Sequence, residues 1–358
     1  MKKHFLSLII CCASISSFAT VRTVSNVPAN LAQFNTIQAA VNASTNGDTV
    51  YVHGSPNGYA AFTITNTRLT IMGPGWAPNK QLAFTALIAG CTLTGSGTTG
   101  TELHGLTFTS TITVNSNHPN DLRFIRNHFI TLGISINEGG VTYSGYLFEG
   151  NIFDNSSADA TPGSTYQNFL FQNNYFYESA CCRDGNINSF NNSVNVLFNH
   201  NLWFGPASGT RNVNSGTSRF LSFTNNIFVR RNPATSVSSS TFNNNITFNA
   251  GENAPWNVNG NINSGGNVEN QDPQMAAQAA VNAGTNNAIA DYSIAAGPAN
   301  NSATDGKDMG LLFDATGSLN WVNSRTSRLP FIFSMNITNP TVAPNASLQV
   351  VVEARKSN

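Results

Sequence analysis

The side chains with the clearest potential for chemistry lie close together in one short segment. Glu178, Arg183 and Asp184 fall within seven positions, with the adjacent cysteines Cys181 and Cys182 between them. Carboxylates can act as general acids or bases, and a guanidinium group can bind an anionic ligand. We therefore take Glu178, Arg183 and Asp184 as the candidate catalytic residues of this chain.

Polar side chains elsewhere extend this candidate site. Insertions between repeated units often form the binding face of a repeat protein, and this segment lies in the longest interval of a repeat described below. The residues that we predict to bind substrate beside it are Glu149, Asp154, Tyr177 and Arg211. The hypothesis is that they line a groove for a glycan. The structural alternative is a surface ion pair between Arg183 and Asp184, with both cysteines buried.

These candidates sit within a repeat of about two dozen residues. Each copy places a phenylalanine in a short apolar stretch and an asparagine three residues later. The phenylalanines are Phe124, Phe148, Phe171, Phe198, Phe223 and Phe242. The asparagines are Asn127, Asn151, Asn174, Asn201, Asn226 and Asn245. A degenerate copy precedes them at residues 103–108, and a last copy is expected at residues 258–261.

The repeat predicts stacked β-strands. The stretch before each phenylalanine alternates in period two, as a strand does. Equivalent phenylalanines of successive coils would stack in the core about 4.8 Å apart, and the asparagines would form a ladder at a turn. The residue before each asparagine is mostly Gly or Asn, which tolerate the left-handed conformation of a sharp bend, and Arg126 is the exception. Helical repeats are excluded, because the region is rich in Phe, Asn, Thr and Gly and has no lysine between Lys80 and Lys307.

The predicted fold is all-β: a right-handed parallel β-helix, or solenoid, of about nine to ten coils. A short helix with Ile37, Ala40 and Val41 on its apolar face would cap the N-terminal end. The predicted boundaries are a signal peptide over residues 1–19, a cap with the first strands over 20–68, the coils over 69–315 and a β-hairpin extension over 316–358. The signal peptide is indicated by Lys2 and Lys3, the apolar run at 5–13 and the small-x-small triplet at 17–19.

Both ends of the coiled region resemble a known family. The order Ile-Gln-Ala-Ala-Val at 37–41, Gly-Asp-Thr-Val-Tyr-Val at 47–52 and Asp-Gly-Lys-Asp-Met-Gly at 305–310 is similar to that of secreted bacterial right-handed β-helix proteins of the pectate-lyase-like superfamily, of the Bacteroidetes type. The resemblance covers about residues 34–312 and implies the fold and secretion. It matches no specific enzyme family, because members include lyases, hydrolases, epimerases and adhesins.

The chemistry of such enzymes requires residues that this chain does not place in recognisable motifs. Lyases on this fold use a lysine or arginine base and often Ca²⁺ on clustered aspartates, and glycoside hydrolases need two or three placed carboxylates. The coils contain no lysine, and their carboxylates are scattered singly. His128 and His200 occupy different repeat positions, so no metal site is predicted, and no cofactor is expected apart from Ca²⁺ if the protein is a lyase.

Two functions therefore remain open. The first is a secreted or cell-surface module that binds a polysaccharide or surface glycan, or serves as a structural element, without catalysis. The second is a polysaccharide lyase or glycoside hydrolase acting on an acidic polysaccharide. An ice-binding threonine array is a third, since Thr107, Thr109, Thr111 and Thr113 alternate, although within one coil. With 9% charged residues and a formal net charge of zero, no nucleic-acid partner is expected. We also expect no membrane span after signal cleavage, and a monomer.

Overall fold

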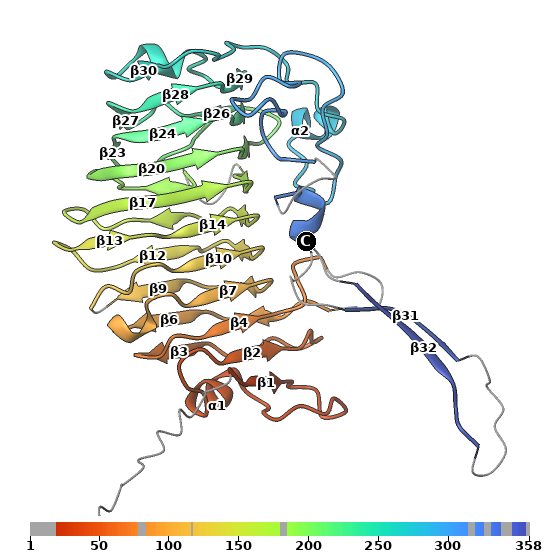
Figure 1. Ribbon diagram of the computed structural model, residues 1–358. Helices are drawn as coiled ribbons and strands as arrows, with labels where there is room; N and C mark the ends of the chain where they lie inside the picture. The colour runs from red at the N-terminus through yellow and green to blue at the C-terminus, as the bar shows by residue number, and fades with distance from the viewer. Residues whose placement is uncertain are drawn as a thin grey trace, which may run out of the picture.

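The protein is a parallel β-helix of about nine coils, as the repeat predicts (Figure 1). This is seen in a computed structural model that describes residues 19–77, 84–115, 117–179, 185–313, 319–325, 331–337 and 346–355. Three parallel sheets run along the stack, and we name them A, B and C. Each coil passes through the three sheets in turn, so residues some two dozen positions apart lie side by side.

The strands of each sheet follow one another along the axis of the stack. Sheet A contains β1 (Val21–Val24), β2 (Thr49–Val52), β4 (Thr70–Met72), β7 (Glu102–His104), β10 (Arg123–Ile125), β14 (Leu147–Glu149), β17 (Thr165–Gln172), β20 (Ser193–Asn199), β24 (Leu221–Thr224), β28 (Thr241–Asn243) and β30 (Ile262–Asn263), with β13 (Thr142–Ser144) beside β17. Sheet B contains β5 (Leu87–Ile88), β8 (Thr107–Phe108), β11 (His128–Ile130), β15 (Ile152–Asp154), β18 (Tyr175–Tyr177), β21 (Leu202–Phe204), β25 (Ile227–Val229) and β29 (Ile246–Phe248). Sheet C contains β3 (Phe62–Thr65), β6 (Cys91–Thr94), β9 (Ile112–Asn115), β12 (Ile134–Ile136), β16 (Ala158–Asp159) and β19 (Ile187–Asn188).

Shorter elements complete the described chain. Two small parallel pairs are β22 (Arg211–Asn212) with β26 (Arg231–Asn232) and β23 (Ser218–Arg219) with β27 (Val237–Ser238). The helices are α1 (Ile37–Asn42) and α2 (Gln278–Asn282), and the 3₁₀ turns are η1 (Ser96–Thr98), η2 (Pro255–Asn257) and η3 (Trp321–Arg325). The predicted C-terminal hairpin is formed by β31 (Phe331–Ile337) and β32 (Val350–Arg355), which pair antiparallel and project from the coils in Figure 1.

The core is a column of stacked phenylalanine rings. The six repeat phenylalanines of sheet A are in register and fully buried. Neighbouring rings in the column have centroids 4.2–5.0 Å apart and planes within 15° of each other. Offset-stacked aromatic pairs contribute about 0.5–1.5 kcal/mol each beyond their burial, so the column stabilises the axis of the stack.

The predicted asparagine ladder lies at the bend from sheet A to sheet B. In one rung, Asn174 Oδ1 accepts from the backbone N–H of Asn151 at 2.9 Å. Its Nδ2 donates to the carbonyl of Phe148 at 2.9 Å and to Asn201 Oδ1 at 3.0 Å. The last rung is Asn267, which accepts from Asn245 N at 2.9 Å. The expectation that the copy at residues 258–261 closes the series was wrong, because Asn261 Oδ1 instead accepts from the backbone of Ser240.

The residue before each ladder asparagine has a left-handed backbone, as expected for this bend. Their φ angles are 60° at Gly105, 56° at Arg126, 64° at Gly150, 53° at Asn173, 53° at His200, 60° at Asn225 and 51° at Asn244. Arg126, the exception in residue type, therefore adopts the same turn as the others. These turn residues lie at the outer corner between sheets A and B, where they meet the C-terminal part of the chain.

A long segment without repeat pattern covers the outer face of sheet B. We call residues 269–313 and 319–325 the strap; it runs beside the coils back toward the N-terminal end (Figure 1). Turn residues hold it: Asn173 Oδ1 accepts from Leu312 N at 2.8 Å, and Asn225 Nδ2 donates to Thr304 at 2.9 Å. The sequence reading assigned residues up to 315 to the coils, whereas the last coil strand of sheet A is β30 and the strap follows it.

The predicted N-terminal cap is α1. Thr36 caps the helix by accepting from Ala39 N, and Ile37, Ala40 and Val41 are buried against the first coil. Gln38 covers the edge strand β3: its Oε1 accepts from Thr63 N at 2.8 Å and its Nε2 donates to Thr63 O at 3.1 Å. The helix thus closes both the apolar end and a strand edge.

Candidate functional site

The candidate catalytic segment is only partly described. Arg183 and Asp184, together with Cys181 and Cys182, lie outside the described residues. Glu178 follows β18 directly and is fully buried, with its backbone N–H donating to the carbonyl of Phe204 at 3.3 Å. A side chain with no exposed surface cannot touch a polysaccharide in this conformation, so its position favours a structural role.

Glu149, Tyr177 and Arg211 do not come together in one groove. Glu149 lies on the outer face of sheet A, 7% exposed, where its Oε2 accepts from Gln172 Nε2 at 3.0 Å. Tyr177 lies under the strap, 8% exposed, and its hydroxyl donates to Gly284 O at 3.2 Å. Arg211 is half-buried in β22, in register with Arg231. None of the three lines either pocket described below.

Asp154 is the predicted substrate-binding residue that does line a pocket. This hollow of about 250 Å³, which we call the Asp154 pocket, lies between the outer face of sheet B and the strap. On the sheet, Asp154 Oδ2 is 3.6 Å from His128 Nε2. Trp76 and the strap residues 286–289 form its other walls. Sequence reasoning missed Trp76, because it stands outside every repeat copy.

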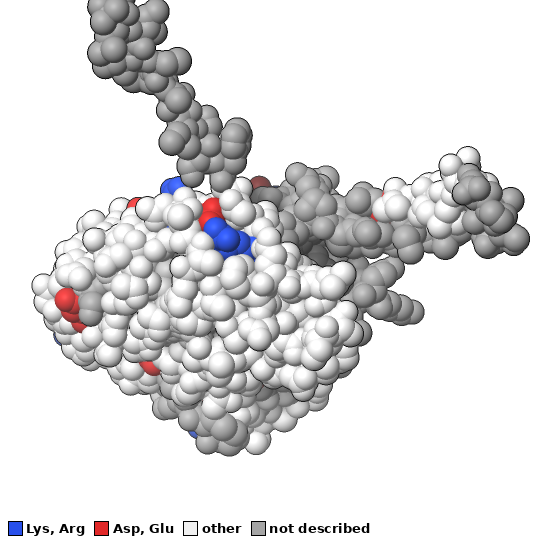
Figure 2. Space-filling view, turned by 90° about the horizontal axis from the view of Figure 1, so that it is seen from below, with Lys and Arg blue, Asp and Glu red and all other residues white. Residues whose placement is uncertain are grey.

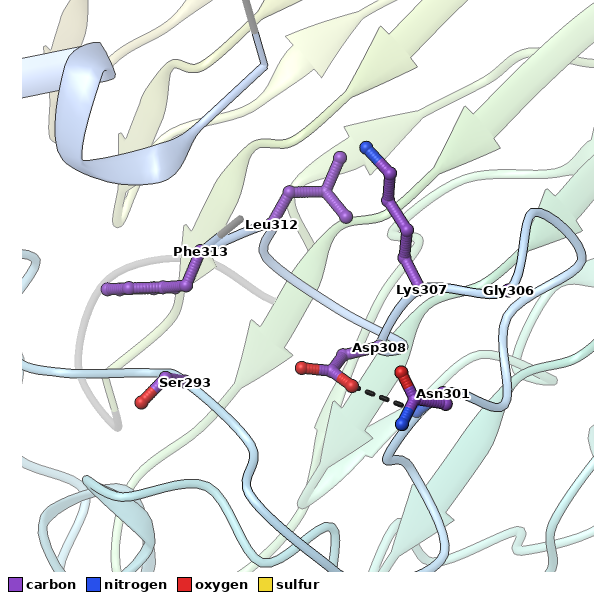
Figure 3. Close-up of a pocket in the computed structure, with 7 residues that line it drawn as sticks. All are labelled: Ser293, Asn301, Gly306, Lys307, Asp308, Leu312 and Phe313. Atoms are coloured by element: carbon purple, nitrogen blue, oxygen red, sulfur yellow. Dashed lines mark hydrogen bonds between the residues drawn. The ribbon is translucent and has the colours of Figure 1, made fainter. Parts of the chain in front are cut away.

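A second pocket, of about 300 Å³, lies within the strap, and we call it the strap pocket. It is lined by Ser293, Asn301, Gly306, Lys307, Asp308, Leu312 and Phe313. Figure 3 shows Phe313 and Ser293 on one side of it and Asp308 and Asn301 on the other. Both pocket volumes lie at or just below the lower end of the usual range for ligand sites, about 300–1,000 Å³.

Tight turns position the polar groups of the strap pocket. Asp308 Oδ1 accepts from Asn301 N at 2.9 Å, which leaves its second oxygen toward the hollow (Figure 3). Asp305 Oδ1 accepts from Lys307 N at 3.2 Å, next to Gly306 in its left-handed conformation. On the far side, hydrogen bonds from the hydroxyl and backbone N–H of Ser293 lower the pKa of the Asp291 carboxyl, although partial burial opposes this.

The strap pocket combines the groups that recognise sugars. A half-buried phenyl ring can pack against the apolar face of a sugar ring, and carboxylate, amide and ammonium groups can bond its hydroxyls. The sequence analysis took residues 305–310 only as a family resemblance at the end of the fold. One signal was available: Lys307 is the first lysine after Lys80.

Threonines on sheet C stack across coils and not only within one coil. Thr63, Thr92 and Thr113 are in register, and so are Thr65 and Thr94 beside them. The first column continues through Ser135 and is then broken by Asp159 and Asn188. This hydroxyl array is therefore confined to the first coils of sheet C, and the two pockets remain the stronger candidate sites.

Charge, metal and membrane features add little. Figure 2, a view onto the N-terminal end, shows charged side chains only in small separate groups. Within the part of the chain that the structure describes, no group of three His, Cys, Asp or Glu side chains is placed to hold a metal ion. None of the described helices is long and apolar enough to cross a membrane.

Comparisons with known proteins leave the family open. No protein-family model matches the chain, and no curated protein matches it. What is established is the parallel β-helix fold itself, with its stacked asparagines.

Proposed function

We propose that this protein is a secreted or cell-surface β-helix protein of the pectate-lyase-like superfamily that binds a glycan through the strap pocket without catalysing its breakdown. The observation that carries the proposal is the convergence of Phe313, Asp308, Asn301, Ser293 and Lys307 on one hollow (Figure 3). Secretion is supported by the signal-peptide pattern at residues 1–19, and non-catalytic binding by the absence of the family's enzyme motifs.

The pocket suits an uncharged or acidic sugar. Lys307 and Asp308 bring one positive and one negative group, so the lining carries no excess of either sign. An ammonium group can pair with a uronate carboxylate, and a carboxylate can accept from neighbouring sugar hydroxyls. Phe313 contributes an apolar contact that a free carboxylate or phosphate would not use.

A glycan-binding measurement tests the proposal. The purified chain is applied to immobilised plant, algal and bacterial polysaccharides, and the best ligand is then titrated by calorimetry. Phe313→Ala should weaken binding about tenfold or more, which corresponds to about 1.4 kcal/mol. Phe220→Ala is the matched control, because Phe220 is 53% exposed and lines neither pocket. Equal affinity of the Phe313→Ala variant and the wild type would contradict the assignment of the strap pocket.

Cleavage of an acidic polysaccharide is the second candidate function. It is favoured by the His128–Asp154 pair in a pocket, since an imidazole beside a carboxylate can serve as a general base. A lyase would produce an unsaturated product that absorbs in the ultraviolet, with activity removed by a Ca²⁺ chelator if Ca²⁺ neutralises the uronate. A hydrolase would release reducing ends. Turnover that is lost in His128→Ala would replace the binding proposal with an enzymatic one.

A further inference from the structure

We propose that the Asp154 pocket binds the acetamido group of an N-acetylated sugar. The inference goes beyond the proposed function and does not depend on it, because the pocket lies between sheet B and residues 286–289 and shares no lining residue with the strap pocket. Its basis is the match between the unused polar atoms of the pocket and the three parts of an acetamido group: a carbonyl, an N–H and a methyl.

The pocket presents N–H donors. Trp76 is 7% exposed, and its Nε1 is buried without a hydrogen-bond partner among the described residues. A buried N–H left unpaired costs about 1–3 kcal/mol, and a ligand oxygen would remove that cost. Asn286 and Asn287 offer further donors, because their side-chain oxygens already accept from Tyr175 and from Ile289 N. These donors call for a carbonyl acceptor.

The pocket also presents one strong acceptor. Asp154 Oδ1 already accepts from Asn155 Nδ2 at 2.8 Å, whereas Oδ2 lies 3.6 Å from His128 Nε2, beyond hydrogen-bond distance. Oδ2 is therefore available to a ligand N–H. Ile152, Ala288 and Ile289 supply an apolar wall for a methyl group.

Other ligand classes fit less well. A carboxylate would be repelled by Asp154, the only acidic side chain among the lining residues. An ammonium group would pair with Asp154 but would leave the Trp76 N–H facing another donor. A sugar that has hydroxyls alone could meet both polar groups, but it has no methyl for the apolar wall. The acetamido group satisfies donor, acceptor and apolar surface together.

The test compares three soluble sugars on the full chain. N-acetylglucosamine, glucose and glucosamine are titrated separately, by calorimetry and by saturation-transfer NMR. We expect N-acetylglucosamine to bind at least about tenfold more tightly than either other sugar, with saturation transfer strongest at its methyl group. Equal binding of glucose, preference for glucosamine, or no binding of N-acetylglucosamine would each overturn the inference.

Variants locate the site. Trp76→Phe removes the indole N–H but keeps an aromatic ring, and it should weaken N-acetylglucosamine binding about tenfold. Trp256→Phe is the matched control, because Trp256 is also buried, at 4% exposure, but packs on Phe242 in the coil core. Asp154→Asn provides a second variant at an exposed edge of the pocket, in case Trp76→Phe does not fold. Unchanged affinity in both pocket variants would overturn the inference.

A cross-check separates this inference from the proposed function. Phe313→Ala should abolish binding at the strap pocket and leave N-acetylglucosamine affinity unchanged, because Phe313 does not line the Asp154 pocket. If Phe313→Ala removes N-acetylglucosamine binding as well, the sugar occupies the strap pocket and the inference is wrong, while the proposed function stands.

Discussion

Each asparagine of the ladder uses both halves of its side-chain amide. The oxygen of Asn174 accepts from the backbone of the previous coil, and its nitrogen donates to a carbonyl of that coil and to the next asparagine. Aspartate has no donor and leucine has neither group, so neither can replace it. The ladder thereby satisfies backbone groups that the left-handed turn takes out of the sheets.

Asn174→Ala should therefore be strongly destabilising. The change leaves Asn151 N and Phe148 O buried without their partners, and each such group costs about 1–3 kcal/mol. We expect the free energy of unfolding, measured in urea, to fall by about 2–5 kcal/mol. Asn192→Ala is the control, since Asn192 is exposed and bonds only a side chain, and it should change stability by less than about 0.5 kcal/mol. Similar losses in both variants would show that the ladder contributes nothing special.

At this scale, repetition separates what sequence can predict from what it cannot. The ladder was predictable because one residue type recurs at one position of every copy, and physics gives that position a single role. The candidate site was not, because Glu178 and Tyr177 stand outside the repeated pattern, and their burial depends on distant residues such as Phe204 and Gly284. Asp154 was named correctly as a pocket residue, but its neighbours Trp76 and His128 were not connected with it.

The strap explains why sheet B reads differently from a half-exposed sheet. The triplets of β18, β21 and β25 are buried at all three positions, so both faces of this sheet are covered. Their outward residues pack against strap residues such as Met309 and Trp321. Continuous apolar triplets were visible in the sequence as a sign of a covered face. The element that covers them was not visible, because the strap has no repeat and little regular structure.

Acidification should loosen the strap at His200. Burial lowers the pKa of this imidazole below its ordinary value of 6.5, although Asp305, with Oδ2 at 3.3 Å from Nε2, opposes the shift. Lys307, Gly310 O and Asn225 are the other groups that face it. The folded state therefore holds the neutral form, and the unfolded state takes up a proton first as pH falls below about 6.5. The free energy of strap opening should fall with decreasing pH through that range.

Hydrogen exchange in strap peptides, corrected for its intrinsic pH dependence, measures this effect. His200→Asn should flatten the pH dependence, and it preserves the turn because asparagine occupies the same left-handed position at 173, 225 and 244. His53→Asn is the comparison, since burial also lowers the pKa of His53 but this residue lies in the first coils. An identical pH profile in wild type and His200→Asn would exclude His200 as the source.

At the scale of the whole molecule, the two ends of the stack carry different solutions to one problem. A parallel stack leaves an apolar cross-section and unpaired strand edges at each end, which invite association. At the C-terminal end the last strand of sheet A, β30, is short, and its two residues are exposed. At the N-terminal end α1 buries Ile37, Ala40 and Val41, and the amide of Gln38 pairs with both backbone groups of Thr63 as a neighbouring strand would.

Ile37→Glu should open the N-terminal end and cause self-association. Ile37 is 2% exposed, and an unpaired charge in its place costs about 3–5 kcal/mol, enough to displace a helix of six residues. Loss of the helix withdraws Gln38 from Thr63 and frees the edge of β3 for pairing with another chain. Size-exclusion chromatography with light scattering should then show oligomers that grow with protein concentration. Asn42→Glu, on the exposed end of the same helix, should remain as the wild type. A monodisperse Ile37→Glu protein of unchanged mass would show that α1 is not what keeps this end of the stack from associating.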